Sequence, residues 1–264
     1  MTRPLSSASV NMSDSMVSLE IDENGVATVR MQHEPDKNAL SVPMVEALQQ
    51  CFARVRENQA VKAVVITGLP QYFCVGASLD VLTNLAGKKI LPEDLVLPRW
   101  ILDLPVPTIA AAEGHALGGG LALAMCADII LIAEESRYGC TFMNMGFTPG
   151  MGTTRLLEHA ISPAIAHEML FTGRAMRGSE LRGKCAFNYV LPRTAVLPKA
   201  LALAVEIAEK PRLSLTLLKE TLSRSRKQIY ESALEDESRM HRQTFAQPGV
   251  REQIEAYLGW KENS

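Results

Sequence analysis

Apolar runs and helix-spaced apolar residues alternate along the first half of the chain. Val17–Ile21 and Val26–Met31 are β-rich runs separated by a polar turn that ends in Gly25, a pattern that predicts a hairpin. Pro43 begins a segment with apolar residues at helical spacing, and this predicted helix ends near Asn58. Further strands are expected at 62–68, 106–113 and 127–133, with a short buried helix at 121–126. Strands that alternate with helices predict parallel pairing through right-handed crossovers.

The pattern becomes mostly helical after residue 152. Helices are expected at 153–171, 177–183, 197–209, 214–224 and 228–245. The predicted fold class is therefore α/β. The chain divides into a Ser-rich flexible leader at 1–15, a core at 16–200 and a helical C-terminal region at 201–264.

Composition narrows the classes of function. Of the 264 residues, 47% are hydrophobic and 21% are charged, and the net charge of −2 argues against binding to nucleic acid or to anionic lipid. The most apolar stretch, 117–133, contains three consecutive glycines and Asp128, so no membrane span is expected. Five scattered cysteines without a CxxC pair argue against a zinc site and a disulfide framework and suit the cytoplasm. No metal or cofactor is expected.

Two glycine-containing turns carry the candidate chemistry. The three glycines at 118–120 lie between a predicted strand and a predicted helix, a geometry that suits an oxyanion or a phosphate. Gly76-Ala77 follows the 62–68 strand and could direct a second N–H at the same point. Two such donors in a dry site stabilise an enolate oxygen, and the loss of one costs about 2.7–4 kcal/mol in the transition state.

These segments resemble the enoyl-CoA hydratase/isomerase (crotonase) superfamily over nearly the whole chain. The matching segments are 36–40, 73–77, 115–120, 126–128, 146–152 and 210–212. The resemblance implies a β-β-α spiral core, a homotrimer or a dimer of trimers, and an acyl thioester substrate. It also implies that Ala77 and Gly119 supply the two N–H donors of the family's oxyanion hole.

The chain departs from the family at the two positions where hydratases carry a catalytic glutamate. Ala122 stands two residues after the third glycine, and Phe142 stands at the second glutamate position. Water addition needs one carboxylate to deprotonate the water and an acid to protonate carbon. Neither alanine nor phenylalanine performs either task, so the sequence excludes a hydratase and an isomerase that relies on the second glutamate.

One branch of the superfamily also lacks both glutamates. Segments 146–152 and 240–245 resemble the decarboxylases of polyketide β-branching, which act on 3-methylglutaconyl groups carried by acyl carrier protein. The resemblance implies a catalytic lysine after the first oxyanion-hole residue, for which Lys88 is chosen with Lys89 as the alternative. It also implies a catalytic histidine, His241. Decarboxylation needs an oxyanion hole, a cation for the carboxylate, an acid and an apolar wall, which Phe142 and Ala122 supply.

Other readings stay open at this point. The chain could be another crotonase-type isomerase or lyase acting on an acyl-CoA with an unrecognised base, for which Asp80 and Glu113 are the nearest carboxylates, or an inactive homologue that only binds. His241 could be an ordinary surface histidine on a polar helix. The sequence leaves open the carrier (acyl carrier protein or CoA), the position of reprotonation, the pathway, and trimer against hexamer.

Overall fold

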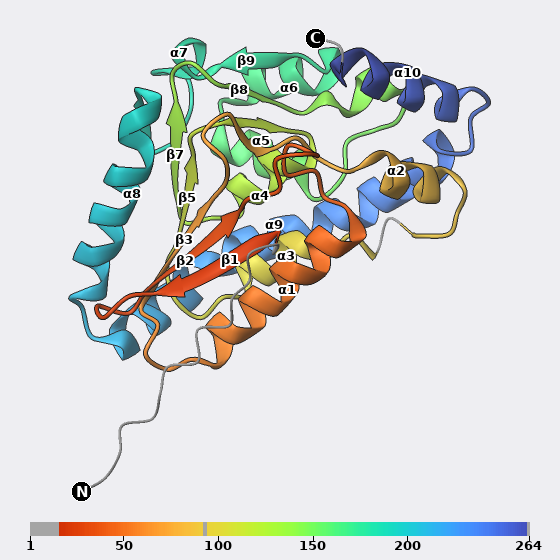
Figure 1. The fold of residues 1–264 in the computed structure, drawn as a ribbon. Helices are drawn as coiled ribbons and strands as arrows, with labels where there is room; N and C mark the ends of the chain where they lie inside the picture. Colours follow the sequence, from red (N-terminus) through yellow and green to blue (C-terminus); the bar gives the residue numbers. More distant parts are fainter. Residues whose placement is uncertain (1–15, 92–93, 263–264) are drawn as a thin grey trace, which may run out of the picture.

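Ten strands form two sheets within residues 16–91 and 94–262, the part of the chain that this computed structural model describes (Figure 1). The larger sheet has six strands, in the order β1 (Val17–Ile21), β2 (Val26–Met31), β3 (Ala63–Thr67), β5 (Thr108–Ala112), β7 (Ile129–Ala133) and β10 (Tyr189–Leu191). The smaller sheet has four strands, in the order β4 (Tyr72–Cys74), β6 (His115–Leu117), β8 (Arg137–Gly139) and β9 (Ala175–Arg177).

Pairing in the larger sheet follows the prediction. β1 and β2 are antiparallel with Val17 opposite Met31, and every later pair in this sheet is parallel. The hairpin turn is closed by the Asp22 carboxylate, which accepts the N–H groups of Asn24 and Val26. Gly25 has φ +85°, a conformation that favours glycine. The hairpin and the parallel crossovers are therefore confirmed.

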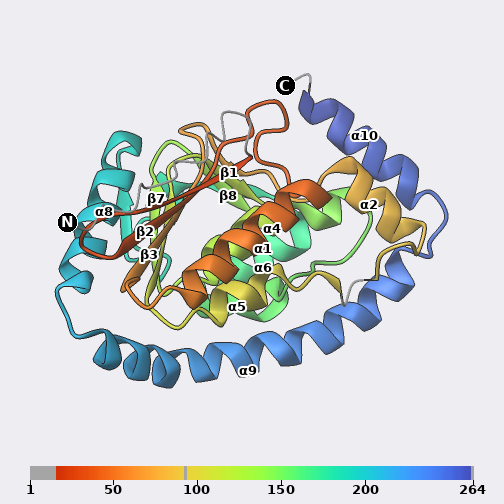
Figure 2. The same cartoon turned by 60° about the horizontal axis from the view of Figure 1, so that its bottom comes forward.

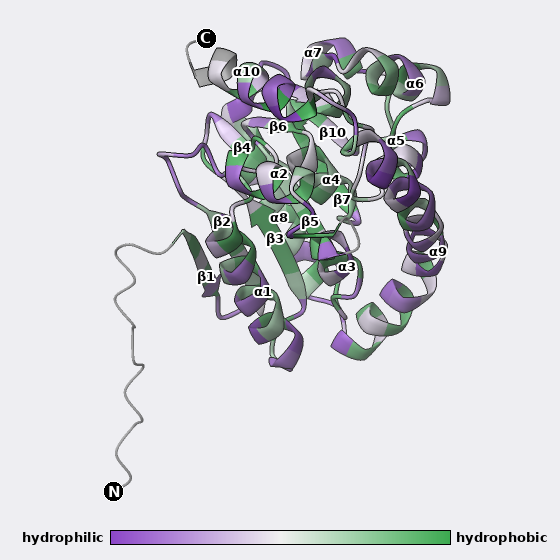
Figure 3. Cartoon of the chain, turned by 90° about the vertical axis from the view of Figure 1, so that its right-hand side faces the viewer, coloured by the Kyte–Doolittle hydropathy of each residue, from purple (hydrophilic) through white to green (hydrophobic). Residues whose placement is uncertain are grey.

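Helices cover both faces of the larger sheet. In chain order they are α1 (Val42–Glu57), α2 (Leu79–Ala86), α3 (Leu97–Leu102), α4 (Gly119–Met125), the 3-10 helix η2 (Thr141–Met145), α5 (Thr153–Ala160), α6 (Pro163–Thr172), α7 (Gly178–Leu181), α8 (Arg193–Ala208), α9 (Arg212–Thr244) and α10 (Val250–Glu262). Figure 1 shows α8 alone along one face, where the small residues Ala200, Ala204 and Ala208 let it pack closely. The larger core lies on the other face, and the central strands are hydrophobic (Figure 3).

Three of the predicted helices are divided differently in the structure. The helix expected at 153–171 is two helices, because Ser162 precedes Pro163 and the residue before a proline is disfavoured in the α conformation. Ile161 is extended there and forms a bridge with Cys185. In contrast, the helices expected at 214–224 and 228–245 are one helix, α9, which runs along one side of the molecule (Figure 2). The polar residues between them contain no helix breaker.

A buried ion cluster holds α9 against the larger sheet. The Asp128 carboxylate accepts the Lys219 ammonium at 2.6 Å and also pairs with Arg226. It further accepts the N–H and the hydroxyl of Thr108. Although burial opposes the charge, Lys219 and Arg226 hold the pKa of Asp128 below its usual value. Through this cluster Arg226, which lies between the two helices expected from the sequence, is turned toward the core.

The expected leader at 1–15 lies outside the described residues. Within the described ranges, no helix is both long enough and apolar enough to cross a membrane.

Candidate active site

The parallel strands of the smaller sheet end at the segments that carry the candidate residues. β4 leads into Gly76-Ala77, β6 into Gly118-Gly119, and β8 into Phe142. β6 pairs in parallel with both β4 and β8, so all three segments emerge at one edge. Ligands bind preferentially at the carboxyl ends of parallel strands. The structure therefore brings the two expected donors and Phe142 together.

The Gly76 and Gly119 backbones are in close contact. A Cβ at Gly76 would stand 2.9 Å from the Leu117 carbonyl oxygen and 3.4 Å from the Gly119 nitrogen. Gly76 has φ +94°, and its carbonyl accepts the Leu40 N–H at 2.8 Å. Gly119 is the first residue of α4, so its N–H has no partner within the helix. This packing suits two N–H groups that share one oxygen.

Ala122 and Phe142 make the surroundings of these donors apolar. Ala122 is fully buried in α4, and Phe142 is 7% exposed. The Phe142 ring lies 3.8 Å from the position a Cβ on Gly118 would take. Phe142 meets Phe147 edge to face at 6.0 Å, and Phe147 stacks on Phe245 at 4.5 Å. These rings form a continuous apolar wall from the glycines to the end of α9.

His241 lies at the far end of this wall. It is 3% exposed, and its ring packs edge to face against Phe147 at 6.1 Å and Phe245 at 5.3 Å. Its Nε2 lies 2.8 Å from the Thr148 carbonyl oxygen. Because a carbonyl only accepts, Nε2 carries the hydrogen in this bond. The alternative of a surface histidine is therefore wrong.

Lys88 and Lys89 lie on the surface directly after α2. Gly87 ends the helix, and Lys88 follows in the left-handed region with φ +56°. Both lysine side chains are exposed. α2 itself packs against α10 (Figure 2). The structure does not bury either lysine with Phe142 and His241.

A buried carboxylate that the sequence analysis missed is that of Glu237. It is 1% exposed and accepts the Gly152 N–H at 2.7 Å and the Thr154 N–H at 2.9 Å. The Thr154 hydroxyl donates a third bond at 2.7 Å. Burial raises the pKa of Glu237 to about 7. The sequence signal was its position four residues before His241, on the same helix face.

The carboxylates considered from the sequence are placed elsewhere. Asp80 is exposed in the first turn of α2, whose N-cap is Ser78. Glu113 lies near Arg30 and Arg193, which oppose the rise in its pKa caused by burial. Within the described residues, no group of three or more His, Cys, Asp and Glu side chains could hold a metal ion.

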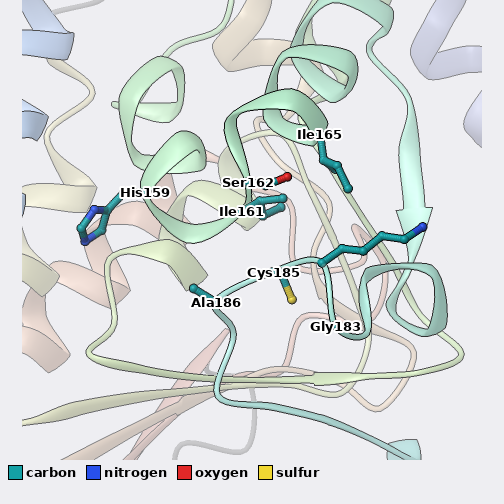
Figure 4. A pocket seen from close by; sticks show the side chains of 8 residues that line it. His159, Ile161, Ser162, Ile165, Gly183, Cys185 and Ala186 are labelled. Carbon is teal, nitrogen blue, oxygen red and sulfur yellow. The ribbon is translucent and has the colours of Figure 1, made fainter.

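A surface hollow of about 580 Å³ lies outside this site (Figure 4). Its lining residues come from the junction of α5 and α6 and from the segment that precedes β10: His159, Ile161, Ser162, Ile165, Gly183, Lys184, Cys185 and Ala186. None of them belongs to the segments at the ends of β4, β6 and β8.

Known proteins are similar to this chain over nearly its whole length. The enoyl-CoA hydratase/isomerase family matches residues 21–263. Bacillaene synthase decarboxylase PksI of Bacillus subtilis is 36% identical over 248 residues, which cover 94% of this chain and 100% of that protein. Two solved structures are similar. One is of a dehydratase/decarboxylase enzyme couple involved in polyketide β-branching, with 37% identity and a TM-score of 0.87 over 91% of this chain and 98% of that chain. The other is the ECH2 decarboxylase domain of CurF from Lyngbya majuscula, with 38% identity and a TM-score of 0.86 over 92% of this chain and 100% of that chain.

Proposed function

The chain belongs to the enoyl-CoA hydratase/isomerase family, and on this premise we propose that it decarboxylates a 3-methylglutaconyl thioester to a 3-methylcrotonyl thioester. It is a carboxy-lyase of the crotonase superfamily. The observation that carries the finer proposal is the close packing of the Gly76-Ala77 and Gly118-Gly119 segments beside two apolar side chains, Ala122 and Phe142. Such a site favours charge on a thioester oxygen and supplies no base for water.

The chemistry follows from these groups. The C4–C5 bond breaks, and its electron pair moves through the C2=C3 alkene onto the thioester oxygen as CO2 leaves. The N–H groups of Ala77 and Gly119 stabilise the resulting oxyanion, each by about 2.7–4 kcal/mol in the transition state. The apolar wall around Phe142 keeps water away and strengthens both bonds. A proton then adds to C4, which gives the 3-methylcrotonyl product, or to C2, which gives its β,γ-isomer.

The reaction needs two further groups, an acid that protonates carbon and a cation that binds the substrate carboxylate. The proposal gives the proton transfer to His241, which is buried at the end of the aromatic wall. It gives the recognition of the substrate carboxylate to Lys88, with Lys89 as the alternative. Both lysines are exposed after α2, within the segment that follows Ala77.

The proposal includes the carrier and the compartment. Similarity to PksI and to the polyketide β-branching structures favours a substrate on acyl carrier protein over one on CoA. The five cysteines are free thiols, which supports a reducing cytoplasm.

The association state is proposed from α9. Its first half carries exposed leucines spaced along the helix: Leu213, Leu217, Leu218 and Leu222. An exposed apolar helix face of this kind marks a protein–protein interface. We therefore expect a homotrimer or a dimer of trimers built on the helical C-terminal region, and sedimentation of the purified protein distinguishes these from a monomer.

Mass spectrometry of the thioester tests the function. Purified protein is mixed with 3-methylglutaconyl groups on acyl carrier protein and, separately, on CoA, in water and in D2O. Loss of CO2 is expected, with faster turnover on acyl carrier protein, and the position of deuterium identifies the carbon that is protonated. Addition of water to 3-methylglutaconyl or crotonyl thioesters, without loss of CO2, would refute the proposal.

A further inference from the structure

Three residues on one face of α9 bind the segment between η2 and α5. His241 donates to the Thr148 carbonyl, and the Thr244 hydroxyl lies 3.3 Å from the Thr148 hydroxyl. One turn earlier, Glu237 accepts three hydrogen bonds from Gly152 and Thr154. Since these positions are spaced by four and three residues, they share one helix face. α9 therefore holds this segment at Thr148 and at Gly152.

The segment between these attachments has an unusual backbone. Met151 has φ +61° and Gly152 has φ +81°, so two consecutive residues occupy the left-handed region. This region is unfavourable for a methionine and persists only where the surroundings impose it. α5 begins at Thr153 without a cap from its own N-cap side chain, because Gly152 has none. The Glu237 carboxylate supplies the missing acceptor for these N–H groups.

This backbone determines what stands beside the candidate oxyanion hole. The Met151 sulfur lies 2.8 Å from where a Cβ on Gly119 would stand, so the side chain packs on the donor residue. Gly150 packs on the His241 ring, whose Nε2 is 2.9 Å from the corresponding Cβ position. Turn 150–152 thus contacts both a proposed oxyanion donor and the proposed acid.

We propose that Glu237 is a positioning residue for the reaction, whose ionised carboxylate holds turn 150–152 in the conformation that keeps Met151 on Gly119 and Gly150 on His241. The inference rests on the proposed function for its activity assay. Glu237 itself acts through the turn, because its oxygens are occupied by Gly152 and Thr154.

Protonation of Glu237 would weaken this arrangement. Its three hydrogen-bond partners are all donors, so protonation removes the charge that strengthens these bonds. With its pKa near 7, the carboxyl changes state in the physiological range. Asp236 and Tyr230 on α9 and Cys140 after β8 interact electrostatically with Glu237. His241 lies one turn later on the same helix face, and Arg155 and Glu158 lie on α5. Asp236 raises the pKa of Glu237 further, while Arg155 and Glu158 pair with each other.

The pH dependence has opposite signs for activity and stability. Activity should rise with pH through about 7, because the ionised carboxylate holds the turn. Stability should fall over the same range, because the folded pKa lies above the unfolded value and the folded protein binds the extra proton. This contribution to stability is complete below pH about 4.5 and is lost as pH rises through about 7. A purely structural residue would shift activity and stability together.

Three variants test the proposal. Glu237→Gln should lower kcat by roughly ten- to a hundredfold at pH 8, with less effect on KM, and should abolish the acidic limb of the rate profile near pH 7. Thr154→Val removes a bond that lowers the pKa of Glu237, so it should move this limb to higher pH. Glu235→Gln, on an exposed part of the same helix, should match wild type.

The readouts are the rate of CO2 release and the unfolding temperature, both from pH 5 to 9. The proposal is supported by two results together. The acidic limb disappears in Glu237→Gln, and the stability that wild type has over this variant falls with rising pH while wild-type activity rises. The proposal is overturned if Glu237→Gln retains the acidic limb of the rate profile, or if Thr154→Val leaves this limb at the wild-type pH. If Glu237→Gln does not fold, the result with Thr154→Val decides. A wild type that releases no CO2 refutes the proposed function instead, while the unfolding data still report whether Glu237 titrates near pH 7.

Discussion

Replacement of Gly150 by alanine should move the His241 ring, which supplies the three heavy atoms nearest to the new methyl group. The new methyl group would stand 2.9 Å from Nε2 and closer still to Cε1. Ordinary contacts between such atoms are about 3.5–4.0 Å. The ring must therefore shift by about 1 Å, which breaks the 2.8 Å bond to the Thr148 carbonyl. Gly150 has no positive φ, so alanine introduces no backbone strain.

The magnitude follows from the two consequences of this shift. Overpacking of a buried site costs about 1–3 kcal/mol of unfolding free energy, which lowers Tm by several degrees. A displacement of about 1 Å in a reacting group costs about a hundredfold in rate. We expect both effects in Gly150→Ala, measured by denaturant unfolding and by CO2 release from the 3-methylglutaconyl thioester.

A double-mutant cycle with His241→Ala isolates the cause. His241→Ala alone should lower the rate by about 10²–10⁴, the usual value of a positioned acid. In that background the ring is absent, so Gly150→Ala should cost little further stability or rate. Gly259→Ala, where a Cβ meets nothing within 4 Å, is the matched control. Equal losses from Gly150→Ala in both backgrounds would refute the reasoning that the methyl group acts through the ring.

The remaining predictions concern the donors, the cation and the fold. Ala77→Pro removes one N–H and should abolish turnover in a folded protein, whereas Ala77→Ser is tolerated; strong activity in the proline variant would remove Ala77 from the mechanism. Lys88→Ala should lose most activity on the glutaconyl thioester but still bind the neutral 3-methylcrotonyl product, and full activity there with a dead Lys89→Ala would transfer the role to Lys89. Asp128→Asn should lower the unfolding free energy by about 3–5 kcal/mol because it leaves Lys219 buried without its counter-charge; a stability near wild type in urea would contradict this.

Elements with strong local signals were predictable from the sequence. The hairpin around Gly25 and the helix begun by Pro43 match the structure to within a residue or two, because turn chemistry and apolar spacing act locally. The second sheet was not predicted, since strands of three residues such as β6 and β8 carry too little periodicity. Their pairing depends on segments distant in the chain.

Some residues of the candidate site could likewise be predicted from the sequence, and others could not. Gly119 and Phe142 were found because a glycine cluster and a family motif mark them, and the structure places both segments at one sheet edge. Glu237 was missed because its partners are backbone N–H groups of residues 152 and 154, more than eighty residues earlier, which leave no side-chain signature. The roles of Lys88 and His241 stay predictions.

The position of the proposed N–H donors, directly after β4 and β6, has a wider consequence. The proposed donors are main-chain atoms, which every amino acid except proline supplies, and they follow two paired strands, β4 and β6. The groups that select the reaction are, in contrast, side chains on the neighbouring helices and loops. Under the proposed mechanism, substitution at positions such as 122 and 142 therefore changes which bond breaks without altering the receptor for the carbonyl oxygen. A scaffold of this kind separates activation of the thioester from the choice of chemistry, so new reactions require no new backbone.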